Sequence, residues 1–251
     1  MLPESRRSVA RMTDLAGASI IVLGATGGLG REFAHQLAAS GARLTLTGRS
    51  MLALDDLGID GAALIPADLT DAGEAEKVVA AAKHAHGRVD GVIVASGAVA
   101  FGPLVDTSDE TLEALWAINV LAPMRVLRAA APALAESAAA GGSPVVVSIS
   151  GVVAETPTAG IGAYSAVKSA QAAAHQVAAR ELRRSGIRVL DARPGHTETE
   201  LSKHPLAGER PAFPLGYAPA AVVTRILDAV RADEKDLPSS AFQGLPTAQA
   251  V

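Results

Sequence analysis

The sequence predicts an α/β fold built on a single doubly wound parallel sheet with helices on both of its faces. Short apolar stretches rich in Val, Ile and Leu alternate with longer helical stretches in the order βαβαβαβαβαβα. This order is typical of parallel sheets, because parallel neighbours need a crossover connection. The strand-like stretches are apolar at consecutive positions, as strands buried on both faces are. The 251 residues contain no repeat, low-complexity segment or interdomain linker, so we expect one domain.

Six strands are predicted from continuous apolar runs that are bounded by turn residues. The first is a run of Ile, Val and Leu that leads directly into a glycine-rich turn, Gly24–Gly30. The expected strands are Ser19–Leu23, Arg43–Thr47, Ala63–Pro66, Gly91–Ala95, Pro144–Ile149 and Ile187–Ala192.

Helices are predicted from the stretches that lie between these strands. Three of these stretches are followed closely by glycine. Glycine readily adopts the left-handed conformation that ends a helix, so it marks their expected ends. Pro123 and Pro132 lie near expected bends in the longest one. The expected helices are Arg31–Ala39, Thr111–Ala140, Ala163–Arg184 and Ala220–Ala232.

The composition excludes several classes of protein. Hydrophobic residues make up 49% of the chain, far more than in disordered proteins. The net charge of −4 offers no basic surface for nucleic acid. Charged residues or glycine interrupt every apolar stretch, so we expect no membrane span. Cysteine is absent and the six histidines are scattered, so we expect neither disulfides nor a metal site.

The N-terminal residues 1–14 are expected to form a flexible leader. Ser5-Arg6-Arg7-Ser8 superficially resembles a twin-arginine export signal. The apolar stretch that follows, Ala18–Leu23, is too short for such a signal and forms the first strand, so we expect a cytoplasmic protein. Met12 is an alternative translation start, since the residues before it are mostly polar.

The turn after the first strand indicates nucleotide binding. Gly24-Ala25-Thr26-Gly27-Gly28-Leu29-Gly30 follows a buried strand and opens a helix, which is the context of a dinucleotide fingerprint. Glycine lets the backbone turn sharply and approach a pyrophosphate, whose charge is met by amides at the helix start. The spacing fits both G-x-x-x-G-x-G and G-x-x-G-x-x-G. A tight structural turn is the alternative.

The end of the second strand favours NADP(H) over NAD(H). An acidic residue there commonly holds the ribose 2′-hydroxyl of NAD, whereas arginine accommodates the 2′-phosphate of NADP. This sequence has Gly48-Arg49-Ser50 and no carboxylate at that place. The guanidinium of Arg49 suits a phosphate, although a solvated arginine would give the same sequence.

Tyr164 and Lys168 are candidate catalytic residues. They lie four positions apart in a predicted helix and therefore share a face. An ammonium beside a phenol favours the phenolate and lowers the phenol pKa from about 10. We therefore expect Tyr164 to act as a general acid or base on a carbonyl or an alcohol.

In combination these motifs resemble the short-chain dehydrogenase/reductase family. The glycine-rich turn, Asp68-Leu69, Asn119, the Tyr-Ser-Ala-Val-Lys pentapeptide at 164–168 and Pro194-Gly195 have the order and spacing of its classical branch. The resemblance covers residues 15–240 and implies a Rossmann-type domain, with residues 241–251 as a tail.

The resemblance implies a role for each matching residue. Amides at Thr26, Gly27, Gly28 and Leu29 would hold the pyrophosphate, and Asp68 and Leu69 would border the adenine. Tyr164 would give its proton to the carbonyl oxygen, and Lys168 would bind the nicotinamide ribose. Asn119 would hold a water for proton resupply, while Pro194, Gly195 and Thr199 would line the nicotinamide. Each also has an ordinary structural alternative, such as helix capping by Asp68.

The sequence departs from the family pattern at three places. Asn-Asn-Ala-Gly after the fourth strand is replaced by Val94-Ala95-Ser96-Gly97, which keeps only Gly97, and Leu23 stands where the family often has Thr. The catalytic serine, thirteen residues before the tyrosine, is replaced by Gly151. We expect Ser150 to supply the missing hydrogen-bond donor, since the flexible glycine allows the loop to shift.

The sequence therefore predicts an NADP(H)-dependent oxidoreductase that interconverts a carbonyl and a secondary alcohol. The alternative is a nucleotide-binding redox sensor or assembly subunit with little turnover, because Gly151 replaces the serine; other chemistry on the same fold is also open. The segments 99–101, 152–158 and 200–217 are chiefly apolar and are expected to line the site, which suits a small, moderately hydrophobic substrate. Residues 200–217 contain three prolines and are expected to form a mobile lid.

The chain is also expected to associate with itself. Alanine accounts for 53 of the 251 residues, and the two longest predicted helices are rich in it. These helices have few large side chains, so another helix can approach them closely. The resemblance implies pairing through these two helices, so a homodimer or homotetramer is predicted.

Overall fold

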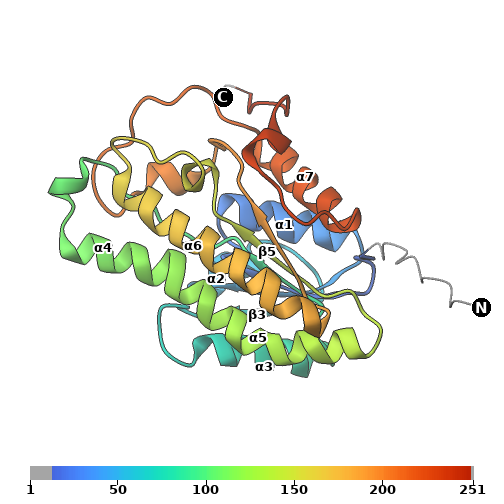
Figure 1. Ribbon diagram of the computed structural model, residues 1–251. Helices are drawn as coiled ribbons and strands as arrows, with labels where there is room; N and C mark the ends of the chain where they lie inside the picture. The colour runs from blue at the N-terminus through green and yellow to red at the C-terminus, as the bar shows by residue number, and fades with distance from the viewer. Residues whose placement is uncertain (1–12, 250–251) are drawn as a thin grey trace, which may run out of the picture.

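Six parallel strands form one sheet at the centre of the molecule. The computed structural model describes residues 13–249 (Figure 1). The sheet has the order β3-β2-β1-β4-β5-β6, in which every neighbouring pair is parallel. This order confirms the predicted doubly wound topology. The strands are β1 Ser19–Leu23, β2 Arg43–Gly48, β3 Ala63–Pro66, β4 Gly91–Val94, β5 Val145–Ile149 and β6 Arg188–Ala192.

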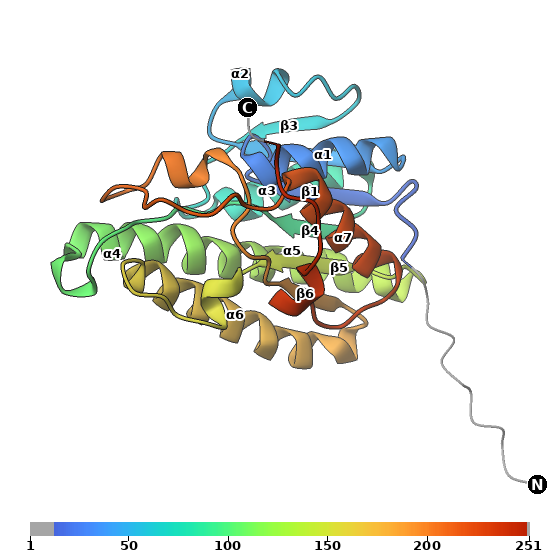
Figure 2. The ribbon, with the colours of Figure 1, turned by 90° about the horizontal axis from the view of Figure 1, so that it is seen from above.

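Helices cover both faces of the sheet. They are α1 Gly28–Ala39, α2 Met51–Asp55, α3 Glu74–His86, α4 Asp109–Trp116, α5 Ala122–Ala139, α6 Gly162–Glu181 and α7 Pro219–Arg231. Figures 1 and 2 show α1 and α7 together on one face and α3, α5 and α6 on the other. The strands begin and end within one residue of their predicted bounds, which confirms the strand predictions. The helices α2 and α3 were not predicted; they lie in the connections after β2 and β3.

Each face of the sheet has its own apolar core, because successive side chains of a strand point to opposite faces. In β1, Ile20 and Val22 pack in the core with α1 and α7, and Ile21 and Leu23 pack in the core with α3 and α5. All four side chains are 2% exposed or less. The continuous apolar run of β1 is therefore explained by burial on both faces.

The longest helical stretch is continuous but irregular at its middle. Between α4 and α5, residues Ala117–Leu121 form a π-helical turn that contains Asn119. Pro123 has no N–H to donate to the carbonyl of Asn119 four residues earlier, which explains a break in the α-helical pattern here. A π turn therefore lies just before Pro123, near which the sequence predicts a bend.

This long helix, from Asp109 to Ala139, is also the one described helix that is long and apolar enough to cross a membrane by length and composition. Its buried residues, such as Val126 and Leu134, pack against the sheet. Arg125 donates from Nη1 to the carbonyl of Thr70 at 2.5 Å. The buried face of this helix therefore packs on the sheet.

Both ends of the described chain pack on the fold. Of the expected leader, residues 1–12, including both possible start methionines, lie outside the described residues, while Thr13 is buried and accepts a hydrogen bond from Arg188. Residues 241–249 differ from the expected tail. Phe242 is fully buried, and Thr247 forms a bridge with Tyr217. A large apolar side chain is the physical reason for this docking.

Candidate functional site

The candidate site lies at the carboxyl ends of the central strands, where the glycine-rich turn joins β1 to α1. Gly24 has φ of +69°, and a Cβ there would lie 2.8 Å from the backbone of Ser96. A Cβ on Gly30 would lie 2.0 Å from the carbonyl oxygen of Gly24. The turn therefore accommodates only glycine at these two positions, and it packs directly on the loop that follows β4.

The start of α1 presents free backbone amides. Gly27 precedes the helix and provides no side-chain cap, and the first turn contains no acidic residue. The amides of Gly28, Leu29 and Gly30 have no intrahelical partner, since they belong to the first turn. Amides at a helix start attract anions, so this end of α1 suits the pyrophosphate that the sequence predicts.

Two further contacts fit this turn to a dinucleotide. A Cβ on Gly28 would lie 2.6 Å from Cβ and Cγ2 of Thr199, so the turn and the loop after β6 come together as the sequence predicts. The Ser96 hydroxyl is buried beside Gly24 and has no hydrogen-bond partner among the described residues. An unpaired hydroxyl, free amides and a cradle without side chains are the features that a bound pyrophosphate would satisfy.

Arg49 and Asp68, which the sequence predicts for the adenosine side of a dinucleotide, follow β2 and β3 and lie near each other. Arg49 follows β2, is exposed, and has no ion pair or side-chain hydrogen bond within residues 13–249. Asp68 accepts hydrogen bonds from the amide and hydroxyl of Thr70 at 3.0 and 2.7 Å. These bonds, followed by the charge of Arg49, lower the pKa of Asp68. Asp68 therefore has a local structural role in a turn with Thr70, but it does not cap α3, whose N-cap is Gly73. Leu69 beside it packs on the core.

Tyr164 and Lys168 lie near the start of α6 and share a face, as predicted. The Nζ atom of Lys168 is 5.8 Å from the centre of the Tyr164 ring. The Tyr164 hydroxyl forms no hydrogen bond with the rest of the described chain, which leaves it available to a ligand.

The pKa of Tyr164 differs from the expectation. Burial raises it to about 12, instead of the predicted lowering by Lys168. Burial also lowers the pKa of Lys168 to about 8, an effect opposed by the charge of Asp191. The reason is desolvation, which penalises both charged forms: Lys168 is buried and Tyr164 is partly buried.

Asn119 connects the π turn to the loop after β4. Its Nδ2 donates to the carbonyls of Ala98 and Leu115 at 3.0 and 2.9 Å, and its Oδ1 accepts the amide of Ala98 at 3.3 Å. A Cβ on Gly97 would lie 3.2 Å from that Oδ1. Asn119 therefore holds the loop that carries Gly97 and Ser96 against the helix.

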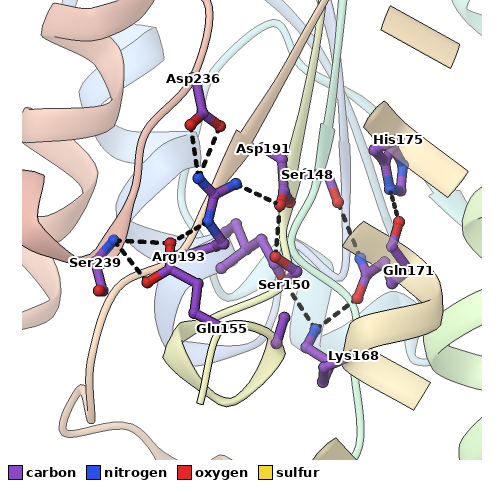
Figure 3. A network of polar contacts seen from close by, with 12 residues as sticks. Ser148, Ser150, Glu155, Lys168, Gln171, His175, Asp191, Arg193, Asp236 and Ser239 are labelled. Atoms are coloured by element: carbon purple, nitrogen blue, oxygen red, sulfur yellow. Dashed lines mark hydrogen bonds and ion pairs between the residues drawn. The ribbon is translucent and has the colours of Figure 1, made fainter. Parts of the chain in front are cut away.

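The expected replacement donor, Ser150, is engaged elsewhere. Its hydroxyl is fully buried and donates to Oδ2 of Asp191 at 2.6 Å (Figure 3). Gly151 has φ of +79° and ψ of 165°, a conformation that a serine would rarely adopt. The backbone at the vacant position is thus unsuited to the family's serine, and the hydroxyl of Ser150 does not substitute for it in this arrangement.

Three carboxylates surround Arg193 next to this loop (Figure 3). The guanidinium contacts Glu155 at 2.5 Å, Asp191 at 3.1 Å and Asp236 at 2.7 Å. The charge of Asp191, which is buried in β6, is therefore compensated. The cluster joins the loop after β5 to the end of β6 and to the C-terminal segment. The signal in the sequence that could have revealed this cluster is Asp191, an acidic residue within a predicted buried strand, because a buried carboxylate requires a positively charged or hydrogen-bonding partner.

The loop after β6 lines the other side of the site. Pro194 accepts the amide of Val152 at 2.9 Å, and a Cβ on Gly195 would lie 3.2 Å from the Tyr217 ring. The backbone of Tyr217 is bonded to His196 at 2.8 Å. These contacts place Pro194 and Gly195 between the loop after β5 and Tyr217.

The segment 200–217 lies over the predicted substrate side of the site. Leu206 donates its amide to Val99 at 2.8 Å, and Phe101 donates to Ala207 at 2.9 Å. The rings of Phe101 and Phe213 are 6.0 Å apart. Residues 99–101 and the expected lid are therefore neighbours, joined by backbone hydrogen bonds and by one aromatic pair.

Comparison with known proteins agrees with this geometry. The family model for short chain dehydrogenase matches residues 18–209. An uncharacterized oxidoreductase of Mycobacterium tuberculosis is 37% identical over 175 residues, which are 68% of this chain and 64% of that protein. The chain therefore spans less than two thirds of the length of this relative.

Two solved structures share the fold. A metagenomic short-chain oxidoreductase in complex with NADP has a TM-score of 0.74 and 27% identity, with 90% of this chain and 98% of that chain covered. The 3-ketoacyl-(acyl-carrier-protein) reductase of Brucella melitensis, complexed with NADH, has a TM-score of 0.81 and 22% identity, with 89% and 97% covered. With the glycine-rich turn, Asn119 and the Tyr164–Lys168 pair in place, the chain belongs to the classical short-chain dehydrogenase/reductase family.

Proposed function

We propose that this oxidoreductase uses NADP(H) to interconvert a carbonyl group and a secondary alcohol on a small, moderately hydrophobic substrate. The observation that carries the proposal is the placement of Tyr164 and Lys168 on one face of α6, with the tyrosine hydroxyl free of partners within the described chain. A phenol with a free hydroxyl beside an ammonium is equipped for proton transfer to a carbonyl oxygen.

The proposed roles follow from the charges of the two residues. The nicotinamide cofactor, when bound, supplies or accepts the hydride. Tyr164 holds a proton at its hydroxyl throughout the neutral range, because burial raises its pKa to about 12, and it gives this proton to the carbonyl oxygen during reduction. In the direction of alcohol oxidation Tyr164 must release the proton, and the positive charge of Lys168 stabilises the phenolate.

Residues for cofactor binding are proposed on the same basis. The amides that open α1 would hold the pyrophosphate, and Thr199 and Gly195 would lie at the nicotinamide end. Arg49 would bind the 2′-phosphate, which favours NADP(H); its side chain is exposed and has no carboxylate bonded to it within residues 13–249. Solved relatives hold NADP in one case and NADH in another, so this preference rests on Arg49.

The experiment is a titration of NADPH and NADH into the protein, followed by a panel of ketones and secondary alcohols. We expect tighter binding of NADPH and turnover of apolar members of the panel. Tyr164→Phe should lower turnover by about 10²–10⁴-fold, the usual contribution of a general acid. Cofactor affinity should change little, since only the hydroxyl is removed. Undiminished turnover in this variant would refute the mechanism.

One observation favours the second candidate, a nucleotide-binding sensor or assembly subunit with little turnover. Gly151 cannot donate a side-chain hydrogen bond, and the Ser150 hydroxyl is committed to Asp191. Ser150 supplies the second donor only if its hydroxyl leaves that carboxylate during the reaction. Ser150→Ala would then lower turnover by about 10²–10³-fold. Cofactor binding with no turnover across the panel would support the sensor.

We also propose self-association and a cytoplasmic location. Large apolar side chains remain exposed on the helices that the family resemblance assigns to pairing, namely Leu112 and Trp116 on α4, Met124 on α5 and Val177 on α6. A second copy of the chain would bury them. The cytoplasmic proposal rests on the segment Ser5-Arg6-Arg7-Ser8: the apolar stretch that follows it, Ala18–Leu23, contains strand β1 of the folded domain.

A further inference from the structure

Lys168 is held in place by residues that belong to none of the family motifs described above. Its side chain is buried, with 5% exposure. The ammonium donates to the carbonyl oxygen of Ile149 at 2.6 Å and to Oε1 of Gln171 at 2.7 Å (Figure 3). An ammonium has three N–H donors, so one remains for another partner.

Gln171 is itself fixed in a single orientation. It is 1% exposed, and its Nε2 donates to the hydroxyl oxygen of Ser148 on β5 at 3.0 Å. If the carboxamide were reversed, its NH₂ group would face the ammonium of Lys168, which has no acceptor to offer. The backbone carbonyl of Gln171 also accepts a hydrogen bond from Nδ1 of His175 at 2.8 Å. The carboxamide therefore bridges β5 and the lysine.

We propose that Gln171 is a positioning residue for Lys168: its carboxamide oxygen, fixed through Ser148, holds the ammonium at the end of β5 and keeps its remaining N–H free for the reacting site. The inference rests on the proposed function, in which Lys168 acts in the protonated form. In this proposal Lys168 is held by the side chain of Gln171, supported by Ser148, as well as by the backbone carbonyl of Ile149.

The charged surroundings of Lys168 make Gln171 important for its protonation. The titratable groups that face the lysine are Tyr164 and His175 on α6 and Asp191 on β6. The π turn 117–121 and residues 152–154, which also pack on α6, contain no acid or base, and the charged residues of α4 are exposed. Burial lowers the pKa of His175, so this histidine is neutral near pH 7. Gln171 Oε1 is thus one of two direct acceptors that compensate a buried ammonium.

The direction of the pH effect follows from this arrangement. The pKa of Lys168 is about 8, and the protonated form is lost as the pH rises through that value. Replacing Gln171 by Met removes an acceptor and leaves the burial, so the pKa should fall. Replacing it by Glu supplies a charged acceptor, so the pKa should rise. Opposite shifts from two substitutions at one position would not arise from a merely structural role.

The test is an NMR titration of the protein carrying ¹³C at the lysine ε-carbons. The chain has five lysines, and the Lys168 signal is assigned by its loss in Lys168→Arg. We expect its midpoint to fall by about one pH unit in Gln171→Met, the size expected for a hydrogen bond to a charged group, and to rise in Gln171→Glu. Gln176→Met, on the exposed face of the same helix, is the control and should leave the midpoint unchanged.

The outcomes are distinct. Equal midpoints in the parent and both Gln171 variants, or shifts of the same sign, would overturn the proposal. If Gln171→Met does not fold, the comparison of Gln171→Glu with the parent decides. The titration needs no substrate, so a failure of the proposed function would appear separately as absent turnover. Where turnover is found, the alkaline limb of kcat/KM for carbonyl reduction should move to lower pH in Gln171→Met and to higher pH in Gln171→Glu.

Discussion

At the scale of single residues, burial controls the chemistry of the site more than proximity does. Tyr164 and Lys168 lie on one face of α6, yet burial raises the pKa of the phenol and lowers that of the ammonium. Both groups are therefore biased toward their neutral forms before a ligand binds. The charge of Asp191 opposes this bias for the lysine, whose ammonium donates hydrogen bonds to Gln171 and to the Ile149 carbonyl.

Arg49 carries a prediction at this scale. If it binds the 2′-phosphate, NADPH should bind at least about tenfold more tightly than NADH, which corresponds to about 1.4 kcal/mol. Arg49→Ala should remove most of this difference and leave NADH affinity nearly unchanged, because only NADPH carries the phosphate. The measurement is fluorescence titration with each cofactor.

Arg183→Ala is the matched control for Arg49→Ala, because Arg183 is also an exposed arginine but lies at the far end of α6. It should preserve the preference for NADPH. Equal affinities for the two cofactors in the parent protein would show that Arg49 is an ordinary surface charge. The exposure of Arg49 also predicts that the preference weakens as salt is added.

At the scale of elements, the site depends on contacts between loops that are far apart in sequence. The turn after β1 contacts the loop after β4 through Gly24 and Ser96, and the loop after β6 through Gly28 and Thr199. The loop after β5 is joined to β6 and to the C-terminal segment by the carboxylates around Arg193. The sheet brings these loops together because parallel strands end at one edge.

Gly28→Ala tests the contact between the turn and Thr199. The added Cβ would lie 2.6 Å from the Thr199 side chain, so one of the two segments must move. Alanine is otherwise a better helix residue than glycine, and the helix itself should not be weakened. We expect cofactor affinity to fall by about tenfold or more.

Thr199→Gly provides the compensating change, since it removes the atoms that the new Cβ would meet. The double variant should regain part of the affinity lost in Gly28→Ala, with thermal unfolding recorded to verify that each protein is folded. Unchanged affinity in Gly28→Ala would show that the turn and Thr199 are not in contact in solution.

At the scale of the whole molecule, the sheet order explains the position of the site. The chain proceeds from β1 through β2 to β3 on one side and from β4 through β5 to β6 on the other. Successive connections therefore run in opposite directions from the centre of the sheet, and the loops after β1 and β4 separate to leave room for a ligand. Gly24 at the end of β1 and Gly97 after β4 lie at this division.

Self-association is the prediction that belongs to this scale. Trp116 is 50% exposed on α4, near the exposed Leu112. Burying an apolar surface of this kind would favour a pair of chains, and a charge placed there would oppose it. We expect the parent protein to exceed the monomer mass of 25.3 kDa in light scattering and Trp116→Glu to shift toward that mass.

Leu52→Glu is the control for this substitution, because Leu52 is also an exposed apolar residue, at 79%, but lies on α2 away from α4 and α6. It should leave the mass unchanged. A monomer in the parent protein at micromolar concentration would contradict the prediction.

Local sequence determined the strands, most helices and the motifs of the site. The apolar runs of β1 and β5 are recognisable because both faces of a central strand are buried. Within the glycine-rich turn, Gly24 is favoured by its positive φ, and Gly30 is required by its contact with the carbonyl of Gly24. Tyr164 and Lys168 share a face because of helical periodicity alone. These properties depend on neighbours in the chain, so the sequence predicts them.

Only the tertiary structure decided which groups meet and which charges are buried. The raised pKa of Tyr164, the bond between Ser150 and Asp191, and the docking of Phe242 each depend on elements distant in sequence. The bridge from Ser148 through Gln171 to Lys168 likewise joins β5 to α6. Hydrogen bonding and desolvation depend on the three-dimensional surroundings of a side chain, and periodicity carries no information about them.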